Sequence, residues 1–197
     1  MINTKNYIKN LNEGLNYINL KTVNKIETKI FNTIKKKQNI FVCGNGGAAS
    51  VANHLLCDFN KGIKISSAKK IKPKVISLSS NLEILTAISN DISYEDIFTF
   101  QLDNYANRGD VLITFSCSGS SKNILNAIKY SNSRDLFTIS FTGFATKKIQ
   151  EYSKINLNVG IKNYGICEDI FQILMHILSQ NIRQRFLSPK KLKNIIL

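Results

Sequence analysis

The two histidines of the chain are the side chains whose spacing first suggests chemistry. Asp58 follows His54 by four residues, and an α-helix would place both side chains on one face, about 40° apart around its axis. His176 stands among apolar residues, with Gln172 four and Glu168 eight residues before it, so a second helix would carry a polar stripe. Two imidazoles and two carboxylates are an acceptable ligand set for zinc or a similar divalent ion, and they can also move protons.

The spacing along the second helix leaves this metal site a hypothesis. Glu168 and His176 are about 12 Å apart along an ideal helix axis, so both reach one ion only if His176 leans back toward the start of the helix. Gln172 is the substitute ligand if they do not. The alternative interpretation of His176, a satisfied core or surface histidine, stays open at this point.

A serine-rich loop is the second feature with a chemical use. Residues 116–121 read Ser-Cys-Ser-Gly-Ser-Ser and lie between an apolar run and a helical segment. Hydroxyls, free backbone N–H groups and the positive end of a helix dipole all favour a bound anion, so we expect a phosphate site. A plain serine N-cap would explain only one or two of these hydroxyls. Neither this loop nor residues 44–47, Gly-Asn-Gly-Gly, matches a nucleotide-binding fingerprint.

The four cysteines and the lengths of the apolar runs limit the cellular environment that we expect for the protein. Cys43, Cys57, Cys117 and Cys167 form no CxxC pair and are expected to be buried, free thiols in a reducing cytoplasm. The sequence has no secretory signal pattern and no apolar run long enough for a membrane span, so we expect no membrane association.

The charge of the chain is strongly positive, at +14 from 27 Lys and Arg against 13 Asp and Glu. The positive residues are mostly scattered lysines, without the interleaved aromatic side chains of a nucleic-acid platform, so we expect no nucleic-acid partner. A positive field would instead help to attract an anionic substrate.

The elements that must position these residues alternate along the chain. Hydrophobic periodicity predicts one broken or two amphipathic helices over 3–37 and further helices at 81–89, 94–107, 123–131 and 166–185, with a turn at 90–91. Apolar runs predict five strands, at 40–43, 74–78, 111–115, 136–141 and 155–159, and residues 60–72 read as a polar, lysine-rich connection. This order predicts an α/β fold, a three-layer αβα sandwich around a mostly parallel five-stranded sheet, with ligands beyond the carboxyl ends of the strands.

We expect a single domain over residues 1–197. It would consist of an N-terminal helical arm at 1–38, an α/β core at 39–187 and a basic tail at 188–197. The arm has to pack either on the core or on a partner subunit, which favours an oligomer.

Several motifs together resemble one known family. They are Val-Cys-Gly-Asn-Gly-Gly at 42–47, Ala-Ile-Ser-Asn-Asp at 87–91, Gly-Asp-Val-Leu-Ile at 109–113, Ser-Cys-Ser-Gly-Ser-Ser-Lys-Asn-Ile at 116–124 and His-Ile-Leu at 176–178. In order and spacing they are similar to the sugar isomerase (SIS) domain, specifically the phosphoheptose isomerase family, across nearly the whole chain. The resemblance implies a flavodoxin-like SIS fold, a zinc ion and a homotetramer with site residues near subunit interfaces. It also implies isomerisation of sedoheptulose 7-phosphate to a heptose 7-phosphate aldose, toward lipopolysaccharide or capsule.

The resemblance assigns roles to single residues. It places Ser116, Ser118 and Ser121 on the phosphate, with Cys117 in the same loop. It places Asn45 and Gly46 at the sugar, with Asp91 as a carboxylate near the substrate. Asp58 takes the place of the family's glutamate base, His176 matches its general acid, and Glu168 matches a glutamine that contacts substrate or metal. The implied metal ligands are His54, Asp58, Glu168 and His176.

Three departures from the family pattern bear on these roles. Asp58 is one methylene shorter than a glutamate, Cys117 stands where a threonine is usual, and Lys61 is only the nearest counterpart of an expected basic residue. Two alternatives therefore accompany the isomerase hypothesis. One is a non-catalytic module that binds a sugar phosphate, and the other is a SIS isomerase for a different phosphosugar.

Overall fold

The structure is a computed structural model that describes residues 3–67, 70–144 and 147–187. Its centre is a five-stranded parallel sheet in the order β2-β1-β3-β4-β5. The strands are β1 (Asn39–Gly44), β2 (Lys74–Ser77), β3 (Val111–Ser116), β4 (Phe137–Thr142) and β5 (Ile155–Asn158). This is the flavodoxin-like order, in which ligands bind beyond the carboxyl ends of the strands at the point where the order reverses. The predicted fold class is confirmed.

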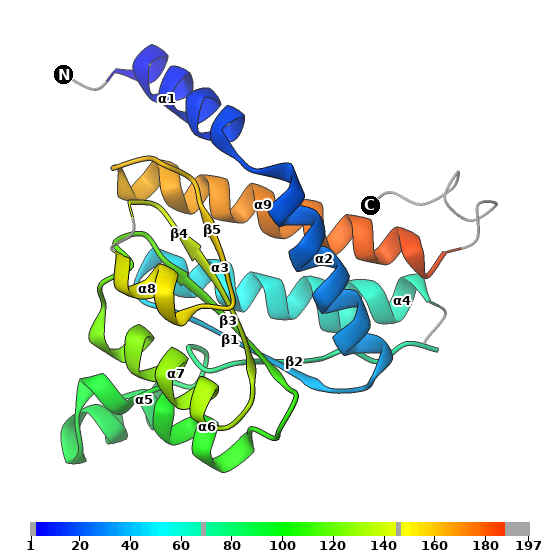
Figure 1. Ribbon diagram of the computed structural model, residues 1–197, viewed down its shortest axis with the longest axis vertical. Helices are drawn as coiled ribbons and strands as arrows, with labels where there is room; N and C mark the ends of the chain where they lie inside the picture. Colours follow the sequence, from blue (N-terminus) through cyan, green and yellow to red (C-terminus); the bar gives the residue numbers. More distant parts are fainter. Residues whose placement is uncertain (1–2, 68–69, 145–146, 188–197) are drawn as a thin grey trace.

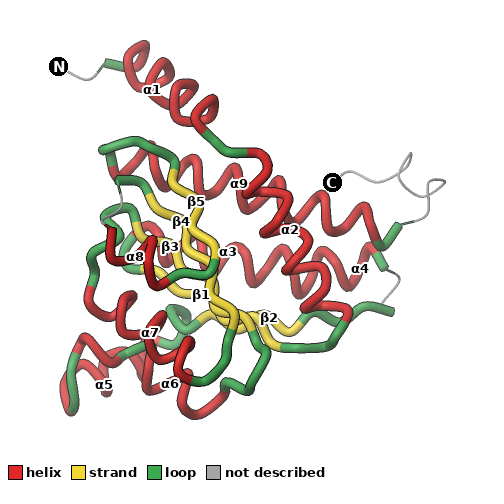
Figure 2. Tube along the Cα trace, in the orientation of Figure 1, coloured by secondary structure: helices red, strands yellow, loops and turns green. Residues whose placement is uncertain are grey.

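Helices cover both faces of the sheet, as Figure 2 shows. One face carries α2 (Leu20–Lys35), α3 (Gly47–Cys57) and α9 (Tyr164–Arg185), and the other carries α5 (Leu82–Asp91), α6 (Thr99–Tyr105), α7 (Lys122–Ser133) and α8 (Lys147–Tyr152). The strands supply both layers because side chains alternate across a sheet. In β1, Ile40 and Val42 join the first core, while Phe41 and Cys43 join the second.

The N-terminal segment forms two helices, α1 (Thr4–Tyr17) and α2, which settles the choice between one broken and two separate helices. Asn3 and Asn19 cap them by accepting hydrogen bonds from the backbone N–H groups of Asn6 and Thr22. The α1 helix projects beyond the sheet and contacts the start of α9 (Figure 1). Its Tyr7 hydroxyl donates a 2.6 Å hydrogen bond to Asp169 on α9.

Three local predictions are wrong. Residues 58–66, expected in part as a connection, continue the helix as a π-helix (Asp58–Ile63) and a short α4 (Lys64–Ser66), because Phe59 and Ile63 are buried in the core. The helix expected over 94–107 is a 3₁₀ turn (Tyr94–Asp96) followed by α6, and Asn90 and Asp91 end α5 rather than forming a turn. The α8 helix between β4 and β5 was not predicted. The tail at 188–197 lies outside the described residues.

In the described part of the chain, none of the helices combines the length and apolar character needed to cross a bilayer.

Candidate active site

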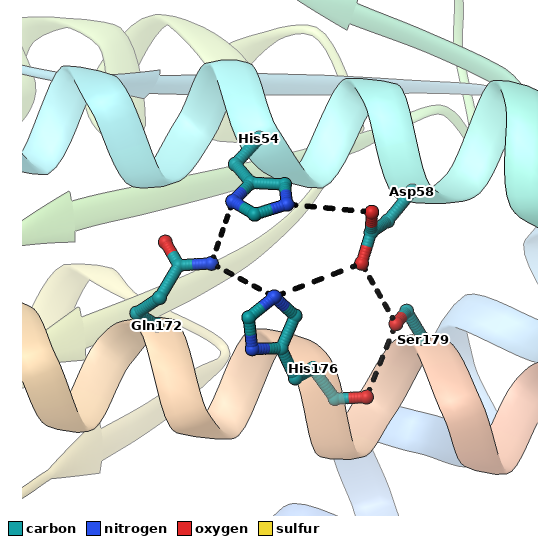
Figure 3. A network of polar contacts seen from close by, with 5 residues as sticks. All are labelled: His54, Asp58, Gln172, His176 and Ser179. Carbon is teal, nitrogen blue, oxygen red and sulfur yellow. Dashed lines mark hydrogen bonds and ion pairs between the residues drawn. The ribbon is translucent and has the colours of Figure 1, made fainter. Parts of the chain in front are cut away.

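Two helices bring the three most reactive side chains together. His54 lies in the last turn of α3, Asp58 is the residue at which α3 passes into the π-helix, and His176 lies in the middle of α9. The Oδ1 atom of Asp58 is 3.5 Å from Nε2 of His54, and its Oδ2 atom is 4.0 Å from Nε2 of His176. The two imidazole rings meet edge to face, with centroids 5.0 Å apart. A carboxylate therefore lies within reach of both imidazoles (Figure 3).

Polar groups on α9 orient this trio. The Nε2 atom of Gln172 lies 2.8 Å from Nδ1 of His54 and 3.1 Å from Nε2 of His176. The hydroxyl of Ser179 donates a 3.3 Å hydrogen bond to Oδ2 of Asp58. Each reactive side chain thus has a partner from the opposite helix or from the next turn of its own helix.

The trio fits a divalent metal ion. The ligand atoms of His54, Asp58 and His176 all lie within 4.8 Å of one another. Metal–ligand bonds of about 2.0–2.2 Å would place the donors of a tetrahedral zinc ion about 3.4 Å apart, close to the shorter separations seen here. Three protein ligands with an open fourth position is the pattern of a catalytic rather than a structural zinc site. The side chains are also accessible to a ligand, at 45% exposure for His54, 42% for His176 and 28% for Asp58.

The serine loop forms a separate pocket of about 90 Å³ at the carboxyl end of β3. Its walls come from the loop and from the first turns of α3 and α9, namely Asn45, Ala48, Phe115, Ser116, Cys117, Ser118, Ser121, Tyr164 and Glu168. Ser121 is the N-cap of α7, yet its hydroxyl makes no hydrogen bond to that helix. The pocket therefore combines hydroxyl groups with a helix N-terminus, as a phosphate site requires.

Glu168 lies in this pocket rather than with the histidines. Its carboxylate accepts a hydrogen bond from the backbone N–H of Ala48 and packs against Gly47, where a Cβ would come within 2.2 Å of its Oε2 atom. Gly47 is required for that close approach, and Gly46, with φ of 56°, for the turn before it. Burial raises the pKa of Glu168 above its ordinary value, against the lowering effect of the Ala48 hydrogen bond.

A paired amide borders the same pocket. Asn45 and Asn123 exchange two side-chain hydrogen bonds, each of 2.9 Å. The hydroxyl of Tyr94 also donates to Oδ1 of Asn45, at 3.1 Å. Asn45 therefore holds a single orientation at the carboxyl end of β1.

Of the remaining predicted residues, Cys117 lines the serine-loop pocket, whereas Asp91 and Lys61 do not. Asp91 is exposed, accepts a hydrogen bond from Asn90 and lines a different, largely apolar cavity of about 250 Å³ beside α5 and α6. Lys61 is exposed on the π-helix. Cys117 is buried beside Cys167. A hydrogen bond with the Cys167 thiol is the main cause that raises the pKa of Cys117 well above the usual range, and burial is the second cause. It stays a neutral thiol.

All four cysteines are free thiols, as expected, and the expectation of burial is confirmed for three of them and wrong for Cys57, which is exposed. Sequence reasoning also missed three contributors: Asn123, Tyr94 and Ser179. Asn123 lies within the quoted serine-loop motif, whereas nothing in the local pattern marks Tyr94 or Ser179 as site residues.

Comparisons with known proteins agree with this geometry. A family model described as the SIS domain matches residues 6–143. The chain is 32% identical over 157 residues to the phosphoheptose isomerase of Helicobacter pylori (strain P12), covering 80% of each protein. It is 31% identical over 170 residues to a probable phosphoheptose isomerase of Thermoplasma acidophilum, covering 86% of this chain and 91% of that one. The structure of phosphoheptose isomerase from Neisseria gonorrhoeae superposes with a TM-score of 0.80 at 25% identity, over 90% of this chain and 93% of that one.

The family model spans more than half of the chain, which makes this protein a SIS-domain protein. The identity to the relatives extends over most of both chains. Within the SIS domain family, the chain belongs to the phosphoheptose isomerases, and it is an isomerase enzyme.

Proposed function

We propose that the protein converts sedoheptulose 7-phosphate to a heptose 7-phosphate aldose through a cis-enediol. The observation that carries this proposal is the carboxylate of Asp58 between two imidazoles, 3.5 Å from one and 4.0 Å from the other. A ketose–aldose isomerisation needs one group to move a proton between two carbons and another to move a proton between two oxygens. A carboxylate beside a neutral imidazole supplies both.

Asp58 is the proposed base. It would take the proton from C1 of the ketose and return it to C2, while the bonding electrons pass through the enediol. His176 would donate a proton to the oxygen on C2 and accept the proton from the oxygen on C1, so that no proton is gained or lost in the cycle. Ser179 keeps the carboxylate of Asp58 oriented during these transfers.

The phosphate group would bind in the serine-loop pocket, to the hydroxyls of Ser116, Ser118 and Ser121. Anchoring the phosphate fixes the register of the sugar and makes the proton transfers effectively intramolecular. The pocket opens at the first turns of α3 and α9, and the histidines lie six to eight residues farther along the same helices. At 1.5 Å per residue this spacing is roughly 9–12 Å, comparable to an extended seven-carbon sugar phosphate. Asn45 and Gly46 would border the sugar between the two ends.

His54, Asp58 and His176 would hold a divalent ion, which we propose to be zinc. When bound, the ion would polarise the carbonyl and hydroxyl oxygens of the substrate. Glu168 would face the substrate at the phosphate end of the site, where it lies beside Ala48. The distance between Glu168 and His176 along α9 is the reason that we assign the two residues to different ends.

We also propose a homotetramer. Large apolar side chains are exposed on and beside α5 and α6, among them Leu82 at 68%, Ile92 at 55% and Phe100 at 47%. A second copy covering such a face would bury it. A cytoplasmic location and a role in making heptose for lipopolysaccharide or capsule complete the proposal.

A turnover assay tests this function. Purified protein would receive sedoheptulose 7-phosphate with zinc supplied or chelated, and the aldose product would be measured beside binding of the sugar phosphate. We expect product with zinc and much less after chelation. Normal sugar binding without product under either condition would overturn the proposal and indicate a non-catalytic sugar-phosphate-binding module. Product from another phosphosugar alone would reassign the substrate.

A further inference from the structure

The carboxamide of Gln172 joins the two imidazoles of the site. Its Nε2 atom is 2.8 Å from Nδ1 of His54 and 3.1 Å from Nε2 of His176, so one amide nitrogen bridges α3 and α9 (Figure 3). Gln172 is not the glutamine of the family pattern, because that position is matched by Glu168, eight residues before His176. Its place between the histidines is a property of this chain.

The hydrogen inventory of this contact determines the state of both rings. An amide NH₂ group carries two hydrogens, and a neutral imidazole has one acceptor nitrogen. Gln172 donates to both rings at once only if His54 carries its own hydrogen on Nε2 and His176 carries its hydrogen on Nδ1. The hydrogen on Nε2 of His54 then points toward Asp58, whose Oδ1 atom is 3.5 Å from that nitrogen.

Metal binding would change what His54 requires of its partner. The nitrogen of His54 nearest to Asp58 is Nε2, and a ligand nitrogen must be free of hydrogen. The ring hydrogen then moves to Nδ1, which needs an acceptor, and metal-ligating histidines commonly donate that second N–H to a carbonyl or carboxylate. Rotation of the Gln172 amide by half a turn would present Oε1, an acceptor, at the same place.

We propose that Gln172 is a positioning residue that fixes the orientation and tautomer of His54 and His176, and that accepts the Nδ1 hydrogen of His54 when a divalent ion binds. The inference rests on the proposed metal site. It predicts that the acceptor atom of residue 172 sets metal affinity, although this side chain need not touch the ion.

Metal affinity gives the first test. Zinc and cobalt affinities would be measured by competition with a chromogenic chelator for the wild type, Gln172→Leu and Gln172→Glu. Gln184→Leu, at an exposed glutamine farther along α9, is the matched control. We expect Gln172→Leu to weaken metal binding by about 10- to 100-fold, the usual effect of losing such a partner. Gln172→Glu should bind at least as tightly as the wild type because a carboxylate still accepts the hydrogen, and the control should not change.

The tautomers give a second test that requires neither metal nor activity. Nitrogen NMR of the metal-free protein should show the Nε2–H form at His54 and the Nδ1–H form at His176. In Gln172→Leu, with its fold verified by circular dichroism, we expect His176 to lose the Nδ1–H preference. If Gln172→Leu does not fold, Gln172→Asn, too short to bridge both rings, should give the same two results.

Two outcomes separate this inference from the proposed function. Unchanged metal affinity and unchanged tautomers in a folded Gln172 variant would overturn the role of Gln172 and leave the isomerase intact. A wild type that binds no divalent ion would overturn the metal site and this inference together. The turnover assay with chelated metal would still report on isomerisation.

Discussion

Asp58 lies one turn beyond His54, and its Oδ1 atom is 3.5 Å from the Nε2 atom of that histidine at the point where α3 passes into a π-helix. Single π-helical turns are rare in proteins, but a large share of those that exist lie at functional sites. The contact holds a short carboxylate beside an imidazole on the side of α3 that faces α9 (Figure 3). The proposed chemistry depends on this pair more than on any other.

Removing the charge of Asp58 should abolish most of the turnover. We expect Asp58→Asn to lower kcat by about 10²- to 10⁴-fold, the range supplied by a positioned general base, with little effect on sugar-phosphate binding at the distant serine loop. Asp58→Glu restores a carboxylate and should retain measurable turnover. Asp103→Asn, at a surface residue paired with Arg134, is the control and should be neutral. Equal kcat in Asp58→Asn and the wild type would remove Asp58 from the mechanism.

The hydroxyl of Ser121 should act in phosphate binding rather than in stability. Because it makes no capping hydrogen bond to α7, Ser121→Ala should leave the melting temperature nearly unchanged. Loss of a hydrogen bond to a charged group costs about 1.5–3 kcal/mol, so KM for the sugar phosphate should rise about 10- to 100-fold. Ser133→Ala, at the far end of the same helix, gives the matched control. The assignment fails if both variants have the same KM.

Glu168 should oppose both folding and phosphate binding at neutral pH. Burial raises its pKa in the folded protein, so the unfolded chain loses its proton first as pH rises. The free energy of unfolding therefore falls as pH rises from about 4.5 through the raised pKa. Glu168→Gln keeps an acceptor for the N–H of Ala48 without the charge. We expect this variant to lack that decline and to bind inorganic phosphate more tightly at neutral pH.

Urea unfolding across this pH range and phosphate competition would measure the two effects. A wild-type stability profile that rises over the same range, relative to Glu168→Gln, would contradict the expected direction.

The contact between α1 and α9 should weaken at high pH. The hydrogen bond from Tyr7 to Asp169 raises the pKa of the phenol from 10.0 to about 12, with smaller contributions from burial and nearby carboxylates. Between these values the unfolded state ionises first, so this contribution to stability is complete below pH 10 and is lost as pH approaches 12. Tyr7→Phe should remove it.

Burial also raises the pKa of Tyr130, so spectrophotometric titration of the wild type would show more than one late-ionising phenol, and Tyr7→Phe should show one fewer. Tyr105→Phe, at an exposed tyrosine of α6, is the control and should keep the late phase. If the late phase disappeared in Tyr105→Phe and not in Tyr7→Phe, the late ionisation would belong to Tyr105, which would contradict the prediction.

Much of the fold was predictable because its signals are local. Apolar runs marked all five strands within one or two residues, and periodic apolar residues marked most helices. Failures came where tertiary packing overrides local composition. The lysine-rich stretch after Asp58 stays helical because Phe59 and Ile63 are buried against the core, which a polar sequence average conceals.

The sequence by itself determined the two halves of the site. A spacing of four residues places His54 and Asp58 on one helical face, and serines after a buried strand predict an anion pocket, because both effects act within a few residues. Only the tertiary structure decided which residues of α9 meet α3. Gln172, 118 positions from His54, lies between the imidazoles, while Glu168 lies at the first turn of α3. The reason is the rise of the helix, because residues eight apart on α9 lie beside different turns of α3. The packing of α9 on α3 determines which turn of α3 each of these residues contacts.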